Sequence, residues 1–211
     1  MPFRTSAEYE AAIPDAIGHL LAGGLLAHPT ETVYGFGCVL EAAPLERLAQ
    51  LKGGREDRAF LVLVGDPAHA PGLRWTEAAE ALANAFWPGP LTIVLAQERA
   101  YPARAAGAGG TVAVRWTAHP GMQRLLRTLA APVTSTSANL PGQPPALSAD
   151  EVGSLVTNPV VAANFLLLDG GVLEPSAPST LVDCSEPVPR LLRAGAIPLD
   201  ELKRWVHDLR S

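Results

Sequence analysis

The chain has 211 residues, a formal net charge of −5 and 48% hydrophobic residues, which suits one domain with a sizeable core. The acidic balance argues against a protein that binds nucleic acid over its whole surface, although it permits a local basic pocket. We expect a cytoplasmic protein, because residues 17–28 are too interrupted to span a membrane, residues 1–15 lack a signal peptide's order, and two cysteines make no disulfide framework.

Helices and strands are predicted to alternate in the first half of the chain. Thr5-Ser6-Ala7-Glu8 is a capping box that begins a helix ending at Gly23-Gly24, with Pro14 disturbing it. The apolar run 25–28 predicts a short buried strand that Pro29 ends. The elements predicted next are a helix at 44–52, a strand at 59–64, a helix at 76–87 and a strand at 90–96.

The second half continues this alternation. Its predicted elements are a strand at 111–116, a helix at 119–130, a β-rich segment at 132–138, a capping box at 148–151, strands at 165–169, 179–183 and 189–193, and an amphipathic closing helix at about 199–210. The alternation predicts an α/β domain with a largely buried sheet. Without a repeat or a dividing linker, residues 1–211 are expected to form a single domain.

Familiar nucleotide and hydrolase motifs are missing from this sequence. Gly35-Phe36-Gly37 lacks the third glycine of a dinucleotide fingerprint, and neither a GxxxxGK[ST] loop nor a GxSxG elbow occurs. The five histidines have no spacing that converges on a metal, so no metal-binding residues are predicted.

A polar cluster follows the first predicted strand, in "HPTETVYGFG". Ligands of open α/β sheets bind at the carboxyl ends of strands, where Thr30, Glu31, Thr32 and Tyr34 could hold a small polar substrate that carries an amine. The alternative is a turn in which the threonines cap the backbone. The residues alone favour the turn.

Cations and hydroxyls elsewhere raise similar alternatives. Lys52, Arg55 and Arg58 flank a glycine turn, which suits phosphate binding or a solvated charge run at a helix end. Arg115 and Arg193 lie on or beside apolar strands, so each needs an anionic partner from the protein or from a ligand. The hydroxyl run 134–137 before Asn139 is equally consistent with hydrogen bonding to a ligand and with an edge strand.

Taken in chain order, these stretches resemble the YrdC/Sua5 family over roughly residues 12–198. The strings that carry the resemblance are "HPTETVYGFG", "LKGGREDRAFLVLV", "FWPGPLTIVL", "GTVAVRWTAHP", "TSTSANLPGQPP", "PSTLVD" and "LLRAGAI". The resemblance implies a twisted open α/β sheet with flanking helices and a concave cationic cavity. Longer members add a second domain, whereas this chain resembles the short form.

The function that the resemblance implies is that of an L-threonylcarbamoyladenylate synthase, a nucleotidyltransferase. Such enzymes combine ATP, L-threonine and bicarbonate or CO2, with Mg2+ accompanying ATP, and release pyrophosphate. A partner transferase complex then moves the threonylcarbamoyl group to adenosine 37 of tRNA.

Site residues follow from the same resemblance. On the threonine side it implies Thr30, Thr32, Arg115, Ser135 and Ser179. On the nucleotide side it implies Lys52, Arg58, Thr111, Ser137, Asn139 and Arg193, with Lys52 and Arg55 as the catalytic cations.

One departure from the family pattern leaves alternatives open. Members typically read Lys-x-Arg-Pro, whereas here Gly54 stands in the arginine's slot and Arg55 in the proline's. Arg55 could reach the same phosphate, since glycines let a loop shift. The alternatives are a paralogue with altered or weak carbamoyl-adenylate activity, and a non-catalytic module with weak RNA binding. The acidic balance and the lack of interleaved aromatic and basic residues count against the RNA-binding module.

Overall fold

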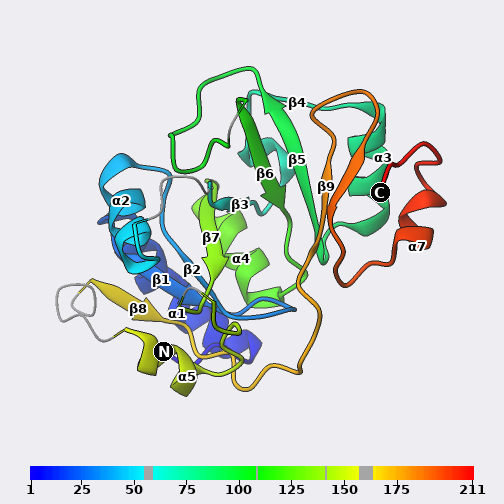
Figure 1. The fold of residues 1–211 in the computed structure, drawn as a ribbon. Coiled ribbons are helices and arrows are strands. Elements are labelled where there is room, and N and C mark those ends of the chain that lie inside the picture. The colour runs from blue at the N-terminus through cyan, green and yellow to red at the C-terminus, as the bar shows by residue number, and fades with distance from the viewer. Residues whose placement is uncertain (55–58, 108, 141, 157–163) are drawn as a thin grey trace.

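A ten-stranded mixed sheet runs through the molecule and carries helices on both of its faces (Figure 1). The computed structural model describes residues 1–54, 59–107, 109–140, 142–156 and 164–211. The helices are α1 Ser6–Leu21, α2 Ala42–Leu51, η1 Pro67–His69, α3 Glu77–Phe86, α4 Pro120–Leu129, α5 Ala149–Leu155 and α7 Leu199–Lys203. The strands are β1 Leu25–His28, β2 Gly35–Gly37, β3 Leu61–Leu63, β4 Leu73–Arg74, β5 Leu91–Gln97, β6 Thr111–Arg115, β7 Val133–Ser137, β8 Phe165–Leu167, β9 Thr180–Asp183 and β10 Arg190–Arg193.

Neighbouring strands in the sheet come from distant parts of the chain. The order is β10-β9-β5-β6-β3-β7-β2-β1-β8, with β4 paired to β5. The pairs β1–β8, β3–β6 and β5–β9 are parallel, and the remaining pairs are antiparallel. This order brings the segments after β1 and β6, the end of β7 and the start of β9 into one region.

Strand β1 shows how the apolar sequence makes two layers. Successive strand residues point to opposite faces, so Leu26 packs in the cluster of α1 and α4, while Leu25 and Ala27 pack against α2 and α5. A third cluster joins α3 and α7 to β5, β6 and β9. Each buried leucine contributes roughly 1.5–3 kcal/mol relative to an exposed one, so this double coverage anchors β1 firmly.

The predicted capping box begins α1, and Pro14 lies inside the helix without ending it. The Thr5 hydroxyl accepts from the Glu8 amide at 3.3 Å, and the Glu8 carboxylate accepts from the Thr5 amide at 2.8 Å. The helix runs through Pro14 to Leu21 because its apolar face is buried against the sheet. Tertiary packing offsets the hydrogen bond that proline cannot make.

The end of the chain corrects the prediction of a long closing helix. The closing helix was expected over about 199–210, whereas α7 ends at Lys203. Beyond it the backbone pairs with the edge of the sheet: the Leu191 amide donates to the Arg210 carbonyl at 2.7 Å, and the Arg210 amide donates to the Pro189 carbonyl at 3.0 Å. These hydrogen bonds to the neighbouring segment satisfy backbone groups of the last residues without a longer helix.

Strand β2 was not among the predicted elements, because a Gly-Phe-Gly segment has little strand propensity. Its second glycine is required by close packing. A β-carbon on Gly37 would lie 2.2 Å from the Thr134 carbonyl oxygen of the adjacent β7, so the two strands meet only if residue 37 has no side chain.

We expect Gly37→Ala to lower the free energy of unfolding by about 1–3 kcal/mol, because the added methyl forces β2 and β7 apart. The matched control is Gly153→Ala in α5, where no atom of the described residues lies within 4 Å of the added carbon. There alanine should stabilise the protein by about 0.5–1 kcal/mol. Urea unfolding of the two variants measures both effects, and equal changes would contradict this account of β2.

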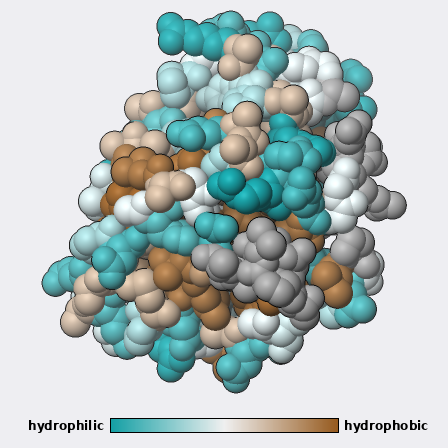
Figure 2. Space-filling view, turned by 90° about the vertical axis from the view of Figure 1, so that its left-hand side faces the viewer, coloured by the Kyte–Doolittle hydropathy of each residue, from teal (hydrophilic) through white to brown (hydrophobic). Residues whose placement is uncertain are grey.

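The surface is mixed in character. The face in Figure 2 shows separate brown hydrophobic patches among teal hydrophilic residues. None of the helices in the described ranges combines the length and apolarity that a membrane span requires.

Candidate active site

A cavity of about 380 Å³ lies over the face of the sheet, bordered by the loop that joins β1 to β2 and by the segment that enters β9. Strands that are remote in sequence supply its floor, and Arg115 and Ser137 lie at the carboxyl ends of β6 and β7. Within the described part of the chain its lining includes two arginines and no carboxylate. The polar lining residues are Thr30, Thr32, Thr92, Arg115, Ser135, Thr136, Ser137, Ser179 and Arg193.

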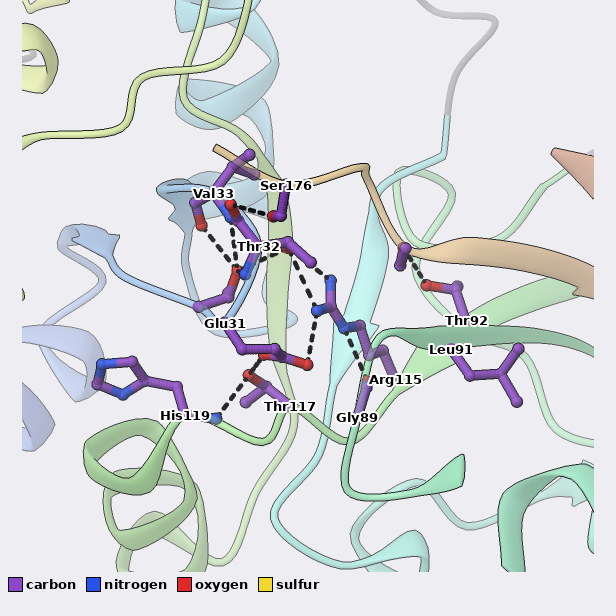
Figure 3. Close-up of polar contacts among 12 residues, drawn as sticks. Glu31, Thr32, Val33, Gly89, Leu91, Thr92, Arg115, Thr117, His119 and Ser176 are labelled. Carbon is purple, nitrogen blue, oxygen red and sulfur yellow. Dashed lines mark hydrogen bonds and ion pairs between the residues drawn. The ribbon is translucent and has the colours of Figure 1, made fainter. Parts of the chain in front are cut away.

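The loop between β1 and β2 meets both interpretations of its polar cluster. The Thr30 hydroxyl donates to the Val33 carbonyl at 2.7 Å and accepts from the amides of Thr32 and Val33, so it caps the turn. Both threonines also line the cavity. Because the Thr30 side chain fixes the turn, the Thr32 hydroxyl is directed toward Arg115 (Figure 3).

Arg115, at the end of β6, is almost wholly buried and is held on several sides (Figure 3). Its Nε donates to the Gly89 carbonyl at 3.2 Å, and Nη1 and Nη2 donate to the Thr32 hydroxyl at 3.4 and 3.3 Å. Its Nη2 lies 2.8 Å from Glu31 Oε1 in an ion pair. A buried arginine that still lines a cavity can offer a fixed cation to an anionic ligand.

Glu31 is the anionic partner of Arg115 within the protein. Its other oxygen accepts a hydrogen bond from the Thr117 hydroxyl. Burial raises the pKa of the Glu31 carboxyl, but the charge of Arg115 and the hydrogen bond from Thr117 together leave it below its ordinary value. Glu31 is therefore a carboxylate at neutral pH, and its pairing with Arg115 could not be predicted from the sequence.

On the opposite wall the start of β9 meets β5 and β10. The hydroxyls of Ser179 and Thr92 are 2.8 Å apart, and Arg193 Nη2 donates to the Ser179 hydroxyl at 3.1 Å. Partial burial and the like charge of Arg115 lower the pKa of Arg193. Thr92 was missed among the predicted site residues, although the string "WPGPLT" contains it.

Lys52 lies at the end of α2 and joins that helix to the end of β7. Its ammonium group donates to the carbonyls of Ser137 and Asn139 at 2.9 and 2.6 Å and to Asn139 Oδ1 at 2.6 Å. The Ser137 hydroxyl donates to Asn139 Oδ1 at 2.7 Å. Lys52, Ser137 and Asn139, which the sequence placed on the nucleotide side, thus form one cluster, and Ser137 connects it to the cavity lining.

The backbone of the Gly53-Gly54 turn explains why glycine stands at 54, where family members typically have arginine. Both glycines have positive φ, 83° and 71°, where other residues are strained by roughly 1 kcal/mol or more. No atom of the described residues lies within 4 Å of a β-carbon added at 54, so the obstacle to an arginine there is the backbone conformation. Arg55 and Arg58, predicted as phosphate-binding cations, lie outside the described residues.

Thr111 and a second hollow lie apart from the polar cavity. Thr111 begins β6 and receives a backbone hydrogen bond from Gly107 at 2.7 Å; it is not among the residues that line the cavity. A larger hollow of about 520 Å³ is lined chiefly by alanine, proline and Tyr101, and it contains none of the predicted site residues. The smaller, polar cavity is therefore the candidate active site.

Two buried histidines lie next to this network. Complete burial lowers the pKa of His28 to about 4, and burial lowers the pKa of His119 to about 4 against the opposing charge of Glu31. Both imidazoles are consequently neutral at neutral pH. Nε2 of His28 has no hydrogen-bond partner among the described residues, so protonating it would place an uncompensated charge in the core.

We expect stability to fall as the pH drops from about 6.5 to about 4. In this window the unfolded histidines, with an ordinary value of 6.5, bind protons while the folded ones do not, so acid favours unfolding. Each histidine contributes a slope of at most about 1.4 kcal/mol per pH unit. Urea unfolding across pH should give a shallower slope for His28→Gln and an unchanged slope for the exposed His207→Gln; equal slopes for wild type and His28→Gln would contradict the assignment.

The protein is of the α/β class, with a mixed sheet and a polar cavity over one of its faces. Comparison with known proteins shows which family of this class it belongs to. The family model described as "Telomere recombination" (Sua5_yciO_yrdC) matches residues 19–195, and the chain belongs to this Sua5/YciO/YrdC family. The solved structure of Pyrococcus abyssi Sua5 in complex with L-threonine is similar, with a TM-score of 0.89 and 33% identity over 100% of this chain and 61% of that chain.

Curated relatives agree with the structural comparison. The chain is 34% identical over 198 residues to the threonylcarbamoyl-AMP synthase of Pyrococcus abyssi, a match that covers 92% of this chain and 57% of that protein. It is 34% identical over 193 residues to the threonylcarbamoyl-AMP synthase of Thiobacillus denitrificans, covering 90% of this chain and 99% of that protein. The chain therefore spans little more than half of the first relative and nearly all of the second.

Proposed function

We propose that this protein is an L-threonylcarbamoyladenylate synthase that makes threonylcarbamoyl-AMP and pyrophosphate from L-threonine, bicarbonate or CO2, and ATP. The observation that carries the proposal is the convergence of a fixed arginine, a second arginine and several hydroxyls on one cavity of the fold shared with the threonine-bound relative. The product serves the N6-threonylcarbamoyladenosine modification of tRNA through a partner transferase complex, and a cytoplasmic location accompanies that role.

The threonine side of the cavity follows from charge and hydrogen-bonding capacity. The guanidinium of Arg115 suits the carboxylate of the amino acid, since it offers paired donors in a fixed plane. Hydroxyls of Thr30, Thr32, Ser135 and Ser179 line the same space and can hold the hydroxyl and amine of threonine. This assignment keeps every threonine-side residue that the sequence predicted.

The nucleotide side is assigned to the cations near the other lining residues. Lys52, Ser137 and Asn139 form one cluster, and Arg193 reaches the cavity from β10. Arg55, Arg58 and Thr111 join this side by resemblance. MgATP is the form of substrate we propose; the described residues include no cluster of three histidine, cysteine or acidic side chains, so Mg2+ is assigned to the phosphates and water.

The reaction needs no covalent enzyme intermediate. The threonine amine adds to CO2 and loses a proton to give a carbamate, and a carbamate oxygen then attacks the α-phosphorus of ATP. The bond from that phosphorus to the bridging oxygen of pyrophosphate breaks, and the pyrophosphate leaves with its electron pair. Arg115 would position the amino acid, while Lys52 and Arg193 offset phosphate charge.

The test is pyrophosphate release that requires both L-threonine and bicarbonate together with ATP. Dependence on both supports the synthase. Turnover with a different amine or carbamoyl compound would instead indicate the altered paralogue that Gly54 suggests. RNA binding without turnover would indicate a non-catalytic module and overturn the proposal.

A further inference from the structure

Glu31 occupies a special place beside the cavity. It is mostly buried and lies in the middle of the β1–β2 loop, yet it is not among the residues that line the cavity. Arg115 does line the cavity, and its Nη2 is 2.8 Å from Glu31 Oε1 (Figure 3). Arg115 is therefore the cavity-lining side chain that the Glu31 carboxylate contacts most closely.

The carboxylate of Glu31 is itself anchored from behind. Its second oxygen accepts from the hydroxyl of Thr117, a residue with no exposed surface. The Thr117 hydroxyl accepts in turn from the amide of His119, the residue that caps the start of α4. A continuous path of hydrogen bonds and one ion pair thus connects the beginning of α4 to the guanidinium of Arg115.

Among the described residues that hold Arg115, Glu31 is the one with charge. The Gly89 carbonyl and the Thr32 hydroxyl are neutral partners at 3.2–3.4 Å, whereas the ion pair measures 2.8 Å. Glu31 Oε1 makes no hydrogen bond among the described residues, so it holds the guanidinium by the attraction of opposite charges at short range in a buried site. Arginine otherwise has several freely rotating bonds, and fixing them before a ligand arrives removes that entropic cost from binding.

We propose that Glu31 is a positioning residue that holds the guanidinium of Arg115 in the orientation that receives the carboxylate of the amino-acid substrate. The inference rests on the proposed function and deepens it, because it assigns substrate affinity to a residue that does not touch the substrate. Glu31 fixes the plane of the guanidinium, and Thr117 fixes Glu31.

The first experiment compares Glu31→Ala with Glu31→Gln by calorimetric titration of L-threonine and by steady-state pyrophosphate release. Glu31→Ala should raise Kd and KM for threonine roughly tenfold to a hundredfold, with KM for ATP unchanged. Glu31→Gln keeps an oxygen facing Arg115 but removes the charge, so its Kd and KM for threonine should lie between those of the wild type and of Glu31→Ala. The matched control is Glu10→Ala, which removes the exposed partner of Arg124 and should change none of these values.

The outcomes separate positioning from structural damage. An unchanged Kd for threonine in Glu31→Ala overturns the proposal, and so does an equal rise in KM for both substrates. A loss in Glu31→Gln as large as that in Glu31→Ala also overturns it, because the amide retains the geometry.

A second measurement remains decisive if Glu31→Ala does not fold or if threonine is not the substrate. The 15N–1H signal of the Arg115 Nε group, assigned by its disappearance in Arg115→Lys, reports rotation and solvent exchange of the guanidinium. It should be sharp in the wild type and broadened in Thr117→Val, which releases Glu31. An equally sharp signal in Thr117→Val overturns the positioning role, whereas failure of the wild type to bind threonine overturns only the proposed function.

Discussion

Replacing Arg115 with alanine should lower the free energy of unfolding by about 3–5 kcal/mol and eliminate threonine binding. The variant leaves Glu31 as a buried carboxylate without its cation, and breaking one half of a buried ion pair typically costs this much. It also removes the paired donors that we assign to the threonine carboxylate. Urea unfolding measures the first effect, and calorimetric titration with L-threonine measures the second.

Two controls make the Arg115 result specific. Arg124→Ala breaks an ion pair whose side chains are 47% and 75% exposed, and it should change stability by no more than about 1 kcal/mol. The double variant Arg115→Met with Glu31→Gln removes both buried charges, so it should recover part of the stability without recovering threonine binding. Wild-type threonine affinity in either variant at position 115 would contradict the proposed role.

Lys52→Ala should reduce pyrophosphate release by a hundredfold or more. Losing one donor that stabilises charge in a transition state typically costs about 3 kcal/mol, and Lys52 also holds the backbone where β7 ends. The rate is measured at saturating ATP, threonine and bicarbonate, so that weaker substrate binding does not mimic a slower chemical step.

The chain contains one other lysine, the exposed Lys203 in α7, which provides the matched control. Lys203→Ala should keep wild-type rates, because Lys203 is exposed and is not among the residues that line the cavity. A Lys52→Ala variant with wild-type release would remove Lys52 from the mechanism, and melting curves of both variants would show whether folding explains a loss.

Much of the fold was predictable because capping boxes and apolar runs act locally. The helices that begin at Ser6 and Ala149 follow Ser/Thr capping signals, and β1 follows its apolar run. Strand β2 and the short α7 were not predictable in this way. Both depend on partners that are distant in sequence, namely β7 for the two glycines and β10 for the last residues.

The residues of the candidate site likewise fall into two groups: those that could be predicted from the sequence and those that could not. From the residues alone the β1–β2 loop was best interpreted as a capped turn, and the family resemblance supplied its role as cavity lining. Thr30 does both, because its hydroxyl can accept from the turn while the residue still borders the cavity. The pairing of Glu31 with Arg115 and the contact of Thr92 with Ser179 required the tertiary structure, since sheet order decides which side chains meet.

The sheet order also limits how this protein can be recombined with its relatives. Strands that are adjacent in the sheet, such as β5 and β9 or β3 and β7, are separated in the chain by other elements. In a chimera of two relatives whose junction lies between β1 and β10, the cavity therefore contains residues from both parent proteins. Such a chimera should retain activity only when the cavity-lining residues of the two parents pack together. Placing the junction in a surface loop does not remove this requirement.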